Sequence, residues 1–201
     1  MKRLLIATGN SHKTEEIRAM LGDGWSVEDL TAHPDVSPAE ENGDTFEANA
    51  TLKALRVSEA VPDVLVLSDD SGLEVDVLGL APGVRSARYA GENASDADNR
   101  ALLKRELALA PQRGRRPPHT GRFRCCMALA ENGKLLGTFC DAIEGTVLEQ
   151  EEGTEGFGYD ALFVPRGFDA SFGSLPPDLK NYLSHRARAL AKAMDWLARR
   201  G

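Results

Sequence analysis

The stretch from Val64 to Asp76 joins a short apolar run to two adjacent carboxylates, and this combination limits how the chain can fold. Val64 to Leu67 is unbroken and apolar, which predicts a buried strand. The strand is expected to break at Ser68-Asp-Asp-Ser-Gly72 and to resume with Leu73 and Val75 alternating against acidic residues. Two carboxylates at the end of a buried strand are costly unless positive charge meets them. A plain turn is the alternative, because Asp, Ser and Gly are common turn residues.

The chain has 201 residues, which suits a single domain over 1–201, with or without two lobes. No apolar run approaches the roughly 20 residues of a membrane helix, so no membrane partner is expected. The apolar run Leu4–Ala7 is too short for a signal peptide, and a cytoplasmic protein is expected.

The net charge is −7 and aromatic residues make up 6% of the chain, so a nucleic-acid partner is not expected. A polyanionic ligand would have to meet a local cluster of cations or a bound divalent metal. Cys125, Cys126 and Cys140 form no pairable framework and have no ligand spacing with the histidines. They are expected to be buried structural thiols.

The first half of the chain alternates strands and helices. Residues 4–7 predict a strand, Thr8-Gly9-Asn10-Ser11 a turn, and residues from about His12 to Leu21 a helix capped by Asn10 or Ser11. Such a layout presents backbone N–H groups to an anion. Lys13 in the first turn opposes the helix dipole, which favours a ligand-directed role, although a solvated lysine is the commoner case.

A second strand is expected at 26–30. A capping box at Asp44–Glu47 then predicts the start of a helix that ends near Ala60. Asn49 and Lys53 lie four residues apart and therefore share one helix face, either in a site or in solvent. Glu41 lies just before this helix and is free to point into a cleft.

The second half predicts a helix over 96–109 capped by Ser95, and strands over 121–130 and 135–142 joined by an Asn132-Gly133 hairpin turn. Pro111–Pro118 is interpreted as a basic surface linker. Ser184 is expected to cap the last helix, whose first turn contains His185 and Arg186. These elements together indicate a mixed α/β fold.

The segment Gly156-Phe157-Gly158-Tyr159-Asp160 places an aromatic residue between two glycines. Glycines there allow a planar ligand to approach the backbone closely. An aromatic side chain packed beneath a turn explains the same pattern.

Basic residues at two helix starts, with Asp69, Asp70 and Glu41 elsewhere, suggest a site for phosphates and Mg²⁺. Mg²⁺ prefers a few carboxylates together with phosphate oxygens and water. Such a metal would also explain how an acidic protein holds a polyanion.

Several collinear motifs resemble those of the inosine/xanthosine triphosphate pyrophosphatase family, which removes non-standard purine nucleotides. The motifs are Ala7-Thr-Gly-Asn-Ser-His-Lys13 with Glu16, Thr45-Phe46 with Asn49-Ala50 and Lys53-Ala54, Ser68–Asp76, Pro82–Gly91, Gly156–Asp160 and Ser184-His-Arg186. They extend along nearly the whole chain and are specific when taken together.

The resemblance implies a fold with a central mixed sheet flanked by helices, an elongated two-lobed shape with a cleft between the lobes, and a homodimer. It implies that Asp70 is the general base and a Mg²⁺ ligand together with Glu41. The implied substrate contacts are Thr8, Gly9, Asn10, Ser11, His12, Lys13, Lys53, Ser71, Phe157, Gly158, Tyr159, Asp160, Lys180, His185 and Arg186. Gly72 is expected to let the backbone turn away, and Asp69 to be a supporting partner rather than a ligand.

The sequence departs from the family pattern at a few positions. Ala48 replaces a usual glutamate, Ala161 a proline, and Leu80 a glycine, while Asp178-Leu179 replaces an acidic pair before Lys180.

The implied reaction is Mg²⁺-dependent hydrolysis of ITP, dITP or XTP to the nucleoside monophosphate and pyrophosphate. A pyrophosphatase for modified pyrimidine nucleotides and a non-catalytic nucleotide sensor are the alternatives. The sensor would not need Asp69, Asp70 and Glu41.

Overall fold

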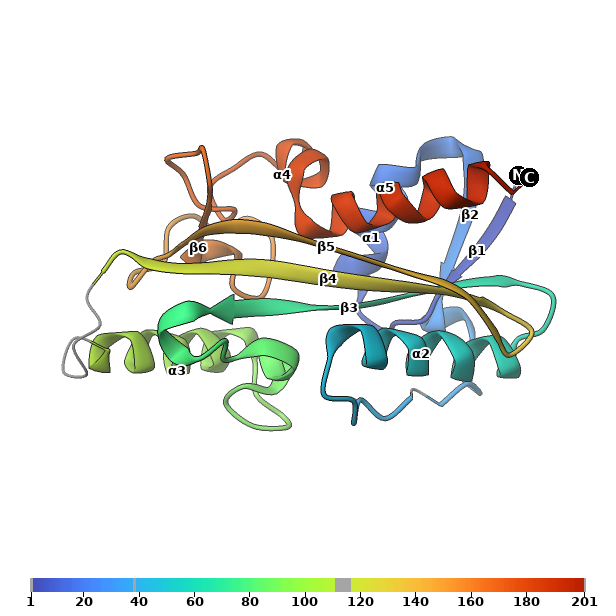
Figure 1. The fold of residues 1–201 in the computed structure, drawn as a ribbon, viewed down its shortest axis with the longest axis horizontal. Helices are drawn as coiled ribbons and strands as arrows, with labels where there is room; N and C mark the ends of the chain where they lie inside the picture. Colours follow the sequence, from blue (N-terminus) through green and yellow to red (C-terminus); the bar gives the residue numbers. More distant parts are fainter. Residues whose placement is uncertain (1, 38, 111–116, 201) are drawn as a thin grey trace. The chain divides into compact units, whose positions relative to one another are not determined.

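The computed structural model describes residues 2–37, 39–110 and 117–200, and these form a six-stranded mixed sheet with helices (Figure 1). The strand order is β2-β1-β3-β4-β5-β6. The strands are β1 (Lys2–Ile6), β2 (Trp25–Asp29), β3 (Leu65–Val75), β4 (His119–Glu131), β5 (Lys134–Val147) and β6 (Phe163–Pro165). The α-helices are α1 (Ser11–Leu21), α2 (Phe46–Ala60), α3 (Asp96–Leu109), α4 (Pro177–Leu183) and α5 (His185–Ala198). The predicted mixed α/β class is confirmed.

The chain divides into two compact units, and each is assembled from separate chain segments. Unit 1 consists of residues 1–70, 125–141 and 185–201, and unit 2 of residues 71–124 and 142–184. β3, β4 and β5 each contribute residues to both units. Each unit has a hydrophobic core of its own.

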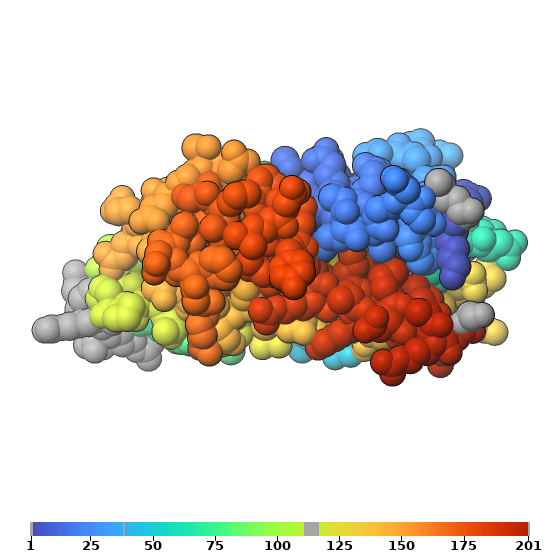
Figure 2. Space-filling view, turned by 90° about the horizontal axis from the view of Figure 1, so that it is seen from above, coloured from blue at the N-terminus to red at the C-terminus, as the bar shows by residue number. Residues whose placement is uncertain are grey.

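In unit 1, helices cover both faces of the sheet because successive strand residues point to opposite sides. Leu4 and Ile6 pack with Ile17 of α1 and Leu190 of α5. Leu5, Ala7 and Val66 pack with Val57 of α2 on the other face. β1 pairs in parallel with both β2 and β3, as expected for strands covered on both faces. α5 also lies beside the N-terminal segments in the space-filling view (Figure 2).

In unit 2, β3 alternates between buried and charged residues as the sequence predicts. Leu73 and Val75 are buried in a core that contains Leu103 and Leu107 of α3. Glu74 accepts hydrogen bonds from the guanidinium groups of Arg122 and Arg124 instead.

The predicted break at 68–72 is wrong, because β3 runs without interruption through the two aspartates. Gly72 does not turn the backbone away. It allows a close approach of chain segments: an added Cβ would lie 2.7 Å from the carbonyl oxygen of Gly83 and would also collide with Ser86 Oγ. The backbone of β3 stays extended because cations and hydrogen-bond donors contact its buried polar side chains. In a turn, these side chains would instead be exposed to water.

Most predicted helix ends and turns agree with the structure, and the N-cap of α2 is the exception. Asn10 caps α1, and Ser95 caps α3 in a capping box with Asp98. Asn132 and Gly133 both have positive φ, as a two-residue hairpin turn requires. The box predicted at Asp44–Glu47 is wrong: Thr45 caps α2 alone, since the third helical residue, Ala48, has no acceptor side chain.

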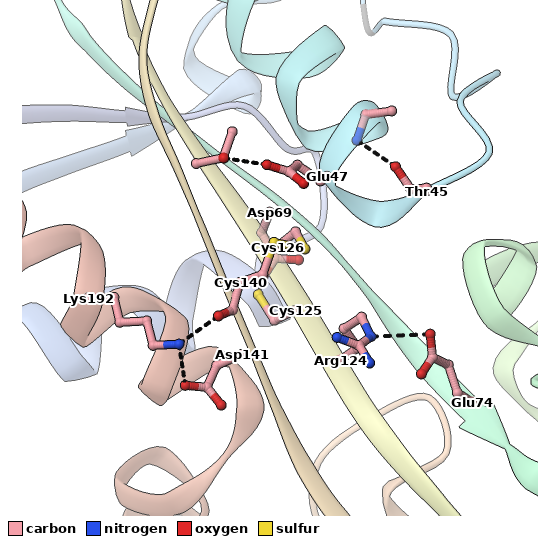
Figure 3. The surroundings of a disulfide bond; sticks show 12 residues. Thr45, Glu47, Asp69, Glu74, Arg124, Cys125, Cys126, Cys140, Asp141 and Lys192 are labelled. Atoms are coloured by element: carbon pink, nitrogen blue, oxygen red, sulfur yellow. Dashed lines mark hydrogen bonds and ion pairs between the residues drawn. A yellow bond between two sulfur atoms is a disulfide. The ribbon is translucent and has the colours of Figure 1, made fainter.

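The cysteine prediction is wrong for two of the three residues and confirmed for Cys125. Cys126 and Cys140 form a disulfide, with Cα atoms 4.1 Å apart on β4 and β5, while Cys125 is buried and free (Figure 3). The hairpin brings together residues that lie 14 positions apart in sequence, and the spacing rules for disulfide frameworks did not reveal this pair.

The predicted basic linker falls mostly on residues 111–116, which lie outside the described residues. Among the helices that the structure describes, none combines the length and apolarity needed to span a membrane.

Gly72→Ala tests the close approach at this glycine. Ser86 Oγ is fixed by hydrogen bonds to Leu73 N and Gly83 O, so it cannot move aside without losing them. We expect the free energy of unfolding to fall by roughly 1–3 kcal/mol, measured by urea denaturation. Gly24→Ala is the control, since its Cβ would meet nothing within 4 Å. Equal stability of the two variants would refute the packing argument.

Candidate active site

Asp69 and Asp70 project to opposite faces of β3, because neighbouring residues of a continuous strand alternate. Asp69 meets side chains from α1, α5 and β4. Asp70 meets the side chains of Asn49 and Lys53 of α2. Each carboxylate therefore has its own set of partners within unit 1.

Asp69 is fully buried between two cations. Its Oδ1 lies 2.5 Å from Lys13 Nζ, and its Oδ2 lies 2.9 Å from Arg186 Nε. Cys125 Sγ is 3.2 Å from the same Oδ2. Arg186, itself buried, also pairs with Glu16 of α1. Asp69 thus joins the first turn of α1 to the first turn of α5.

The charge state of Asp69 follows from these partners. Burial alone would raise the pKa of its carboxyl group, but the charges of Arg186 and Lys13 hold the pKa well below its usual range. Burial raises the pKa of the neighbouring Cys125 thiol. Asp69 is therefore a permanent anion and Cys125 a neutral thiol, so the cluster has a fixed set of charges.

Asp70 is also buried, and each of its oxygens has a separate partner. Lys53 Nζ lies 2.8 Å from Oδ1, while Asn49 Nδ2 donates to Oδ2 at 3.2 Å. Asn49 Oδ1 in turn accepts from Gly43 N. Lys53 and Asn49 share one face of α2, as their spacing predicts, and this face lies in the cluster rather than in solvent.

Lys53 also contacts Glu41, so Asp70 and Glu41 share this cation. Burial would lower the pKa of Lys53, but Asp70 and Glu41 together raise it. Burial raises the pKa of Asp70, and the opposing charge of Lys53 does not cancel that effect. A raised carboxylate pKa makes Asp70 a stronger proton acceptor than an ordinary aspartate.

The donor set around Lys53 suits a hard divalent cation. Glu41 Oε1, Asp70 Oδ1 and the Asp69 backbone oxygen lie 3.0, 2.8 and 2.8 Å from Lys53 Nζ. Within the described ranges, no group of three or more His, Cys, Asp or Glu side chains is placed to hold a metal. Two carboxylates with one backbone oxygen fit Mg²⁺, which completes its shell with phosphate and water oxygens.

The start of α1 presents polar groups at the surface of unit 1. Asn10 Oδ1 accepts from the backbone N–H groups of His12 and Lys13, and Thr8 Oγ1 accepts from Asn10 N. Gly9 is exposed, with open space where a Cβ would stand. Ser11 and His12 are exposed as well. An anion can approach the positive end of the α1 dipole here.

A second cluster lies in unit 2 and is formed by three predicted residues. Lys180 Nζ lies 2.6 Å from Asp160 Oδ2 and 4.8 Å from the centre of the Phe157 ring. The Phe157 backbone N–H donates to the same carboxylate oxygen. Gly156 is required there, because an added Cβ would collide with the Asp160 carboxylate. Asp160 therefore orients the Phe157 ring and the Lys180 ammonium beside each other.

The remaining predicted residues differ in exposure. Tyr159 is buried in the core of unit 2, where its hydroxyl donates to Ser86 O. Burial raises the pKa of this phenol. Gly158 and Ser71 are half-buried, and His185 is buried at the start of α5.

Sequence reasoning gave no site role to Glu16 or Cys125 and left Asn49 open between a site and a solvated face. Asn49 had a usable signal, since it lies one helical turn before Lys53. Glu16 had only its place in a motif. Cys125 had none, because its contact with Asp69 arises from strand pairing of residues 56 positions apart.

Asp69→Asn tests the structural importance of the buried pairings. The variant leaves Arg186 and Lys13 without their shared carboxylate, so we expect the free energy of unfolding to fall by about 3–5 kcal/mol in urea denaturation. Glu92→Gln, which weakens the contacts of an exposed carboxylate with Arg85 and Arg88, should change stability by less than about 1 kcal/mol. Similar losses in both variants would contradict this role.

Comparison with known proteins confirms the resemblance seen in the motifs. A dITP/XTP pyrophosphatase of Geobacter sulfurreducens is 45% identical over 202 residues, covering 100% of this chain and 99% of the relative. The dITP/XTP pyrophosphatase of Bacillus subtilis is 41% identical over 193 residues, covering 96% and 95%. The solved structure of a HAM1 protein from Coxiella burnetii has a TM-score of 0.86 at 33% identity, covering 99% of this chain and 100% of that one. The Ham1 family model matches residues 4–196, and the chain belongs to this family.

Proposed function

We propose that this protein hydrolyses non-standard purine nucleoside triphosphates, namely ITP, dITP and XTP, to the nucleoside monophosphate and pyrophosphate. The observation that supports this most is Asp70, a buried carboxylate of raised pKa held beside Lys53 and Glu41. The relatives named dITP/XTP pyrophosphatase support the substrate class.

Glu41 and Asp70 would hold Mg²⁺. The bound ion would neutralise phosphate charge and orient the attacking water. The residues of the chain supply the rest of the chemistry. Asp70 accepts a proton from the water while the water oxygen bonds to the α-phosphorus. The bond between the α-phosphorus and the oxygen of the β-phosphate then breaks, which releases pyrophosphate.

The cations of unit 1 would stabilise the phosphates. Lys13 is held in place by Asp69 at the start of α1, and Lys53 by Asp70 and Glu41. Cations fixed before the substrate binds need little reorganisation as charge develops in the transition state.

The cluster in unit 2 would bind the base. The Phe157 ring provides a stacking surface, and Lys180 provides an ammonium that can only donate hydrogen bonds. A donor suits the six-position oxygen of hypoxanthine and xanthine and disfavours the amino group of adenine. Guanine has the same oxygen, so its exclusion requires a clash or an unpaired donor at its two-amino group.

Mg²⁺ as the metal, the homodimer and the cytoplasmic location are parts of the same proposal. The hard oxygen donors support Mg²⁺, and the family resemblance supports the homodimer. Light scattering after gel filtration measures the oligomeric state directly.

A substrate panel tests the proposed function. We expect pyrophosphate from ITP, dITP and XTP in the presence of Mg²⁺, and little from ATP or GTP. Release from modified pyrimidine nucleotides alone would indicate the alternative substrate class, and no release from any nucleotide would indicate a sensor.

Asp70→Asn tests the proton acceptor. We expect kcat for ITP to fall by roughly 10²–10⁴-fold, because the amide cannot accept the proton from water. Circular dichroism should show an intact fold. The matched control is Asp35→Asn, an exposed carboxylate outside the cluster, which should leave kcat unchanged. Retained turnover in the Asp70 variant would remove it as the base.

A further inference from the structure

Lys53 uses the same oxygen atoms that a divalent metal would use. Its ammonium lies within 3.0 Å of Glu41 Oε1, Asp70 Oδ1 and the Asp69 backbone oxygen. The side chain is largely enclosed, with 11% of its surface exposed, so water does not separate these charges. The three oxygens come from two places in the sequence, Glu41 before α2 and the neighbours Asp69 and Asp70 on β3, and they converge on one cation.

The Asp70 carboxylate cannot easily serve both cations at once. Asn49 binds its other oxygen, and Gly43 N in turn fixes the Asn49 amide. This arrangement aims Oδ1 at Lys53, which Glu41 also contacts. Mg²⁺ needs its oxygens at about 2.0–2.1 Å, whereas an ammonium holds them near 2.8–3.0 Å. A metal at this place would also lie next to a positive charge.

We propose that Lys53 is a built-in competitor for the metal site, so that the divalent ion binds effectively only together with the triphosphate. This inference rests on the proposed function. An entering metal must displace the ammonium, and the displaced ammonium needs another anion. The triphosphate supplies that anion to Lys53 and also supplies oxygen ligands to the metal. The free protein therefore has low metal affinity, and binding of metal and nucleotide is positively coupled.

Mn²⁺ binding in the absence of nucleotide tests the competition. Binding is measured by electron paramagnetic resonance for the wild type, Lys53→Met and Lys53→Arg. We expect Lys53→Met to bind Mn²⁺ at least about tenfold more tightly than the wild type, because the competing charge is gone. Lys53→Arg keeps a positive charge, so its affinity for Mn²⁺ should stay as weak as that of the wild type. Lys192→Met removes an ammonium from an exposed pair with Asp141 and should match the wild type.

Equal Mn²⁺ affinity in the wild type and Lys53→Met would overturn the proposal, and so would tight binding to the free wild type. If Lys53→Met does not fold, NMR of the lysine ammonium groups in the wild type tests the competition instead. The Lys53 signal should stay unchanged with Mg²⁺ alone and move when Mg²⁺ and inorganic pyrophosphate are added together. A signal that moves with Mg²⁺ alone contradicts the proposal.

Turnover of ITP by the wild type separates this inference from the proposed function. Turnover combined with unchanged Mn²⁺ affinity in Lys53→Met would refute only the competition. Absence of turnover with any nucleotide would refute the proposed function, whatever the Mn²⁺ affinities are.

Discussion

The alternation of side chains along one continuous strand is the constraint on which unit 1 depends. Asp69 and Asp70 are neighbours in sequence, yet the strand sends them to opposite faces of the sheet. One buried face alone could not compensate two adjacent carboxylates. Because helices cover both faces, Lys13 and Arg186 meet one carboxylate, and Lys53 and Asn49 meet the other.

The two carboxylates consequently have different chemistry despite identical side chains. Asp69 is surrounded by two cations that keep its pKa low, and it has no proton to exchange at neutral pH. Asp70 shares a single ammonium with Glu41, so burial dominates and raises its pKa. Environment, not residue type, separates a fixed anchor from a proton acceptor.

Local signals in the sequence were sufficient to predict most helices and strands, whereas the candidate site residues were taken from the family resemblance and their roles stay a prediction. Helix caps such as Asn10 and Ser95 and the Asn132-Gly133 turn are encoded within a few residues, so they could be predicted. The continuous path of β3 could not, since Asp and Ser favour turns locally and only distant cations make the extended form stable. The Cys126–Cys140 bond likewise depends on pairing across a hairpin.

The pairing of Arg186 with both Glu16 and Asp69 has a consequence for synthesis on the ribosome. The three residues come from the first tenth, the middle third and the last tenth of the chain. A nascent chain can form β1, α1 and β3 early, but Asp69 lacks its guanidinium partner until α5 has left the exit tunnel. The completed charge cluster therefore requires α5 to have been synthesised, and a product truncated before this helix would lack it.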